Sequence, residues 1–124
     1  MNPAVLAVLI AAVLPIVCAG IAKWRARGYD NHEPRAWLSA QAGWRARANA
    51  AQQNSFEAFP MFAAGVILAS LQGADQEAIA WCCWSFIAMR LLYIYCYVMD
   101  WSTLRSIAWL LGLIAVVRLY VLAL

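Results

Sequence analysis

The chain has 124 residues, of which 66% are hydrophobic and only 12% are charged, and its mean hydropathy is +0.70. This composition excludes an ordinary soluble globular domain. The net charge of +3 is modest and comes from basic residues in one loop, where membrane topology and anionic headgroups explain it better than nucleic acid does. A membrane-spanning chain must form helices or a closed barrel, and because no apolar–polar alternation is visible, the sequence predicts helices.

Four apolar segments follow one another along the chain, each about as long as the 20 residues that span a bilayer. We expect helices at about residues 3–24, 45–71, 76–99 and 102–124. Pro60 should bend the second helix, Gly73 suits its end, and Asp75 suits the cap of the third. Asp100 and Ser102 are capping candidates for the fourth. Because the connections are short, we predict one all-α integral membrane domain, residues 1–124, folded as a four-transmembrane-helix up-down bundle.

Basic residues gather from the end of the first segment to the start of the second and are missing from the next loop. The six are Lys23, Arg25, Arg27, Arg35, Arg45 and Arg47. The loop at 72–77 has no Lys or Arg and carries Asp75 and Glu77. By the positive-inside rule the first loop is cytoplasmic, and both termini lie on the opposite side. We expect a multi-pass protein of a bacterial inner membrane, in contact with membrane lipids.

The four cysteines, Cys18, Cys82, Cys83 and Cys96, all lie in apolar segments. Their positions give no metal-ligand spacing with the single His32, so we predict no metal site. Free cysteine in such a place is usually a small buried hydrophobe.

The second segment carries polar side chains where a membrane helix normally has none. Arg47, Ala50, Asn54 and Glu57 are three or four residues apart and share one helix face, which Gln53 borders. A carboxylate and an amide inside a bilayer are costly and by default mark a functional site. The alternative is that they only join helices by hydrogen bonds.

The third segment carries a second polar set, Arg90, Tyr93 and Tyr97, on one helix face. At 1.5 Å per residue, Glu57 lies about 16 Å and Arg90 about 14 Å below the same membrane surface. We therefore predict a buried ion pair between Glu57 and Arg90, because a lone buried charge would be too costly. A purely structural pair is the alternative to a functional site.

These residues resemble the signature of the MAPEG family, the membrane-associated proteins of eicosanoid and glutathione metabolism. The matching positions are Arg47-Ala48, then Asn54, Glu57, Pro60 and Phe62, then Arg90, Tyr93 and Tyr97, and Arg105 near the start of the fourth segment. The family includes microsomal glutathione transferases and leukotriene C synthase.

The resemblance implies a homotrimer that binds glutathione, as co-substrate, between protomers. The activity would be that of a glutathione transferase or peroxidase, with Arg105 over the sulfur as the catalytic residue and an apolar electrophile as acceptor. The implied binding residues are Arg47, Gln52, Gln53, Asn54, Glu57, Arg90, Tyr93 and Tyr97. Small residues on the second segment, such as Ala48 and Ala51, would let neighbouring helices approach.

The sequence departs from the family at Ala50, where the eicosanoid enzymes commonly have an arginine. Either Arg47 replaces it or the contact is missing, and either Arg25 or Arg27 contributes from the first helix. Two other functions stay open. One is a lipid-binding relative without catalysis. The other is a small four-helix proton/drug antiporter, which the expected pairing of Glu57 disfavours because such a transporter needs a carboxylate free to titrate.

Overall fold

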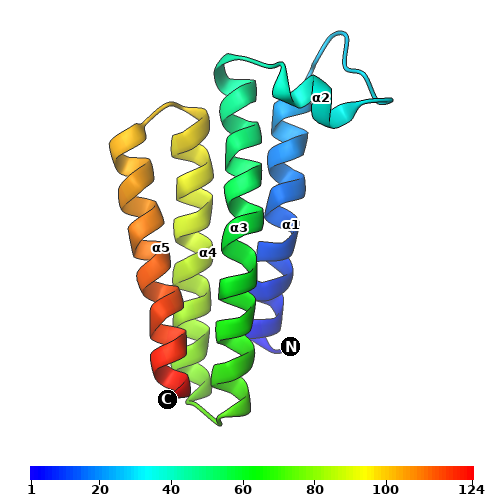
Figure 1. Ribbon diagram of the computed structural model, residues 1–124. Coiled ribbons are helices and arrows are strands. Elements are labelled where there is room, and N and C mark those ends of the chain that lie inside the picture. The colour runs from blue at the N-terminus through cyan, green and yellow to red at the C-terminus, as the bar shows by residue number, and fades with distance from the viewer.

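The computed structural model describes residues 1–124, and the chain forms five helices and no strand (Figure 1). They are α1 (Pro3–Lys23), α2 (Pro34–Ser39), α3 (Gly43–Leu71), α4 (Gln76–Val98) and α5 (Ser102–Ala123). All but α2 are long and apolar enough to cross a membrane. The predicted all-α class with four long apolar helices is confirmed. The short helix α2 was not predicted, since the residues before it are turn formers; it begins at Pro34, whose fixed φ suits a first helical position.

Side-chain caps and a left-handed glycine set several helix ends. The Asn2 side chain accepts a hydrogen bond from the Ala4 amide at 2.9 Å, and Asp75, as predicted, accepts one from the Ala78 amide at 2.8 Å. Gly73 has a φ of +74° just after α3, and the next amide donates to the Ala69 carbonyl at 3.0 Å. These bonds satisfy helix-end groups that would otherwise lack partners.

The turn between α4 and α5 differs from the expected one. Neither Asp100 nor Ser102 caps α5, since Trp101 holds the cap position without a side-chain bond. Asp100 instead takes a φ of +63°, and the Trp101 amide donates to the Cys96 carbonyl at 2.8 Å. Aspartate tolerates this left-handed conformation better than most residues do. The tight turn makes α4 and α5 antiparallel neighbours.

Helix α3 is the element around which the bundle packs, because it contacts each of the other helices. Figure 1 shows α1 on one side of it and α4 and α5 on the other, with both termini at the end opposite α2. Phe62 of α3 is fully buried and stacks on Phe86 of α4 with ring centroids 4.1 Å apart. Large apolar side chains on the outer faces, such as Leu9 and Trp81, are exposed, as a membrane-facing surface requires.

Candidate functional site

Arg90 of α4 is held inside the bundle by hydrogen bonds to α3. Its side chain is 4% exposed; Nη1 donates to Asn54 Oδ1 at 2.8 Å and Nη2 donates to Ser55 Oγ at 3.0 Å. The guanidinium also lies 4.2 Å from the centre of the Tyr93 ring, where a cation is attracted to the ring face. No buried side-chain nitrogen or oxygen in the protein lacks a partner. Neutral acceptors and an aromatic face therefore accommodate this charge.

The predicted ion pair between Glu57 and Arg90 is wrong. Glu57 is exposed, and its Oε2 accepts only a long hydrogen bond, 3.5 Å, from Asn54 Nδ2. The depth estimate brought Glu57 and Arg90 to one level, and both line the same hollow. Their directions around the helix axis differ, however, because Asn54 and Ser55 face α4 while Glu57 lies toward the surface. Asn54 bridges the two charged groups.

The polar row continues along α4 to the start of α5. The rings of Tyr93 and Tyr97 meet edge to face with centroids 5.6 Å apart. Arg105 of α5 lies over the other end of this pair, with Cζ 4.4 Å from the centre of the Tyr97 ring. The short turn between α4 and α5 brings these residues together. One polar row thus crosses three helices and consists of Glu57, Asn54, Arg90, Tyr93, Tyr97 and Arg105.

Two hollows open along this row. The first, of about 220 Å³, is lined by Asn54, Tyr93, Tyr97, Arg105, Ser106 and Trp109. The second, of about 200 Å³, is more apolar and includes Glu57, Arg90, Met61 and Phe86. Asn54 and Trp109 line both hollows.

The sequence reasoning missed three residues of this region: Ser55, Ser106 and Trp109. Trp109 had a detectable signal, since it follows Arg105 by four residues and must share its helix face. No signal in the sequence pointed to Ser55, because a single serine beside Asn54 does not show which helix it faces.

Arg47 lies apart from this row and binds the end of α4. Its Nε and Nη2 donate to the Val98 carbonyl at 3.2 and 3.0 Å. Arg45 does the same for α1, with Nη1 2.8 Å from the Ala22 carbonyl. Basic side chains at helix C-termini satisfy free carbonyls and oppose the negative end of the helix dipole. This position gives Arg47 a structural role, with two of its five N–H donors bound to the Val98 carbonyl.

Gln52 and Gln53 are not brought to the Arg90 row within one chain. They line a separate hollow of about 380 Å³ between α2 and α3, together with Arg35, Ser39 and Asn49. The structure thus divides the predicted binding residues among three places: the row around Arg90, the end of α4 where Arg47 binds, and this hollow.

The cysteines behave as the sequence predicted. All four are buried and free of disulfides. His32 is exposed in the first loop, and no three His, Cys, Asp or Glu side chains lie close enough together to hold a metal ion.

Four long apolar helices with a hydrogen-bonded polar row between them define an integral, multi-pass membrane protein with an intramembrane polar site. The model of the MAPEG family matches residues 3–124, essentially the whole chain. The protein therefore belongs to the MAPEG family, whose members act in glutathione and eicosanoid metabolism, as its motifs indicated. A search of curated proteins found no match to the chain.

Proposed function

We propose that this protein is a glutathione-dependent transferase that activates the glutathione thiol for attack on an apolar electrophile. The proposal rests on the position of the Arg105 guanidinium. Its guanidinium stacks on Tyr97 at the mouth of a hollow lined by Asn54 and Tyr93, and it is not engaged in any hydrogen bond to the protein. Arg90 and Arg47, in contrast, already donate to protein acceptors.

The chemistry of glutathione suits the groups that remain available. Its carboxylates call for guanidinium groups, its amine for a carboxylate such as Glu57, and its peptide groups for amides such as Asn54. A hollow of about 220 Å³ is small beside the roughly 300–1,000 Å³ of typical ligand sites. One protomer therefore offers only part of a site for a tripeptide.

A homotrimer would complete the site from a second protomer. In our proposal, one protomer supplies Asn54, Glu57, Tyr93, Tyr97 and Arg105, and its neighbour supplies the hollow with Gln52 and Gln53. The Arg35 guanidinium in that hollow is a candidate for the carboxylate contact that Ala50 lacks. This arrangement gives every predicted residue except Arg47 and Arg90 a direct ligand contact, while those two hold the helices in place.

The reaction needs a thiolate, and a free thiol has a pKa of about 8.5. Lowering that pKa by two units takes about 2.7 kcal/mol of preferential thiolate stabilisation. A partly desolvated Arg105 beside the sulfur is well suited to supply it. The thiol proton leaves to water at the mouth of the site. The sulfur then bonds to the electrophilic carbon, and the leaving group departs with its electron pair, so that an aryl halide and glutathione give a thioether and hydrogen halide.

The test uses purified protein in mild detergent and makes three measurements. They are glutathione binding, the ultraviolet absorbance of the bound thiolate as a function of pH, and the rate of conjugation of an activated aryl halide. We expect saturable binding, a thiolate signal at neutral pH and turnover above the uncatalysed rate. Binding of lipid without any glutathione binding would overturn the proposal in favour of a non-catalytic lipid-binding relative.

Proton-coupled transport is the weaker alternative. Because Glu57 is not paired with Arg90, pairing of this carboxylate does not disfavour an antiporter. We favour a glutathione transferase over a transporter because the chain belongs to the MAPEG family.

A further inference from the structure

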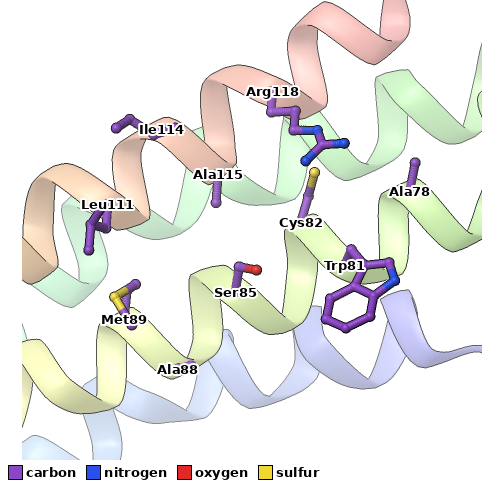
Figure 2. Close-up of a pocket in the computed structure, with 10 residues that line it drawn as sticks. All are labelled: Ala78, Trp81, Cys82, Ser85, Ala88, Met89, Leu111, Ile114, Ala115 and Arg118. Atoms are coloured by element: carbon purple, nitrogen blue, oxygen red, sulfur yellow. The ribbon is translucent and has the colours of Figure 1, made fainter.

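A groove runs between α4 and α5 on the outer face of the bundle, away from the polar row. Its volume is about 650 Å³, within the range of ligand sites, and eight of its ten lining residues are hydrophobic. Figure 2 shows Leu111, Ile114 and Met89 toward one end and Trp81 and Arg118 toward the other. Trp81 is 67% exposed, so the groove opens outward.

Arg118 is the one charged residue of this groove and has no partner in the protein. It is exposed, and it makes no ion pair or hydrogen bond through its side chain. Its guanidinium extends over Cys82 into the groove (Figure 2). Arg118 lies five residues before the end of α5 at Ala123, so about 7.5 Å along the axis. A long basic side chain at that depth reaches the headgroup level of a bilayer, where tryptophan is also favoured.

No carboxylate of the protein pairs with Arg118. Glu57, within α3, lies 14 residues from the helix end at Leu71, so about 21 Å deep from the same side. Asp75, the N-cap of α4, and Glu77, in its first turn, lie at the surface of this end and do not pair with Arg118. A second copy packed over the groove would have to bring one of its surface carboxylates to the guanidinium, because an unpaired charge in an apolar contact is strongly unfavourable. A bilayer supplies the matching anion at this level directly, as a lipid phosphate.

We propose that the groove between α4 and α5 is a binding site for an anionic phospholipid. Its phosphate pairs with Arg118, and one acyl chain lies along the groove past Ser85 toward Met89 and Leu111. A guanidinium binds a phosphate through two parallel charge-assisted hydrogen bonds, and the apolar walls accept the chain.

The first experiment measures lipid retention by native mass spectrometry after exchange into mixed micelles of phosphatidylglycerol and phosphatidylcholine in equal amounts. We expect wild type to retain phosphatidylglycerol over phosphatidylcholine. Arg118→Gln should lower this preference about fivefold, the share of one basic residue at an anionic surface, and Arg118→Lys should keep part of it. Lys23→Gln, at the other end of the bundle and outside the groove, is the matched control and should change the preference much less. Equal retention of both lipids by wild type would overturn the proposal, and so would an unchanged preference in Arg118→Gln.

The second experiment tests the chain-binding part of the groove. Ala88→Phe should fill the groove without touching Arg118 and should reduce retention of phosphatidylglycerol. Phosphatidylglycerol brominated on its acyl chain should quench tryptophan fluorescence more in wild type than in Trp81→Phe, and the difference is the quenching of this one tryptophan among seven. If oleate displaces the lipid at equal concentration, the occupant is a fatty carboxylate and the phospholipid assignment fails. If the native oligomer carries no lipid and cross-links through this face, the groove is a protein interface and the proposal fails as well.

Discussion

At the scale of single residues, the site is governed by how Arg90 is satisfied. Its partners are the neutral side chains Asn54 and Ser55, so the charge is held by directional hydrogen bonds and not by an opposite charge. This arrangement leaves Glu57 and Arg105 with capacity for a ligand.

Asn54 should therefore matter more to stability than Glu57. Asn54→Leu leaves an Nη donor of Arg90 unsatisfied in a buried place, which costs about 1.5–3 kcal/mol for a hydrogen bond to a charged group. Glu57→Gln should leave thermal stability close to that of wild type, because Glu57 is exposed and unpaired with Arg90. The measurement is thermal unfolding in detergent without glutathione. A larger loss of thermal stability in Glu57→Gln than in Asn54→Leu would show that Glu57 and Arg90 form an ion pair.

Arg105 should act on the thiol more than on affinity. If bound glutathione ionises near pH 6.5 in wild type and near 8.5 in Arg105→Ala, the thiolate fraction at pH 7 falls roughly 25-fold. The lowered pKa favours the thiolate above pH 6.5, so the variant should regain rate as pH rises above 8.5. Conjugation rate and thiolate absorbance across pH test this expectation, with Lys23→Ala as control. Identical titrations of wild type and Arg105→Ala would remove Arg105 from catalysis.

At the scale of helices, a close approach between α3 and α5 fixes how the bundle is packed. A Cβ on Gly65 would lie 3.0 Å from the Tyr120 ring and 3.2 Å from Leu119 Cβ. The ring has little freedom to move, because the Tyr120 hydroxyl donates to the Met61 carbonyl at 3.0 Å. The absence of a side chain at residue 65 thus lets α5 lie against α3, which also brings Trp109 beside Asn54.

Gly65→Ala should destabilise the protein by about 1–3 kcal/mol, the usual cost of overpacking. Gly20→Ala is the matched control, since a Cβ there would meet nothing within 4 Å. That change should be neutral or stabilising by up to about 1 kcal/mol, because alanine is the better helix former. Denaturation of both variants in the same detergent decides the matter. Equal stability of the two would show that α5 can shift away without loss.

At the scale of the whole molecule, two of the small residues of α3 cannot serve the proposed trimer. Ala48 and Ala51 were expected to allow close approach between protomers, but both are fully buried inside one chain. The hollow with Gln52, Gln53 and Arg35 and the outer face of the Arg105 hollow remain for contact between copies.

A site shared between protomers can be tested by complementation. Arg105→Ala and Arg35→Ala chains, carrying different tags, should each be weakly active alone. In a cyclic trimer containing both chains, one of the three interfaces has both native halves, so purified mixed trimers should regain about one third of wild-type activity. No recovery in mixed trimers would place the site within one chain, and a monomer or dimer by mass measurement would exclude the arrangement.

The orientation in the membrane that the loop charges predict can be tested with introduced thiols. We expect Arg27→Cys, in the first loop, to face the cytoplasm and Gln72→Cys, at the other end, to face away from it. The native cysteines are buried and should not interfere. A membrane-impermeant maleimide applied to intact cells should label Gln72→Cys only. The reverse labelling would invert the topology and separate the Arg105 end from cytoplasmic glutathione.

The sequence by itself determined the four long helices, their ends to within about two residues, and the common level of Glu57 and Arg90 along the bundle. Length and hydropathy determine where a helix crosses a bilayer, and a constant rise per residue converts position into depth. The family motifs added the identity of the polar row.

Only the tertiary structure decided which side chains meet. Spacing along a helix gives directions relative to that helix alone, whereas a contact also depends on how each helix is rotated toward its neighbours. Packing at Gly65 and Phe62 sets that rotation, so Asn54 and Ser55 contact Arg90 and Glu57 does not. The same rotation directs Gln52 and Gln53 toward α2 and opens the groove beside Arg118, neither of which is visible in a linear pattern.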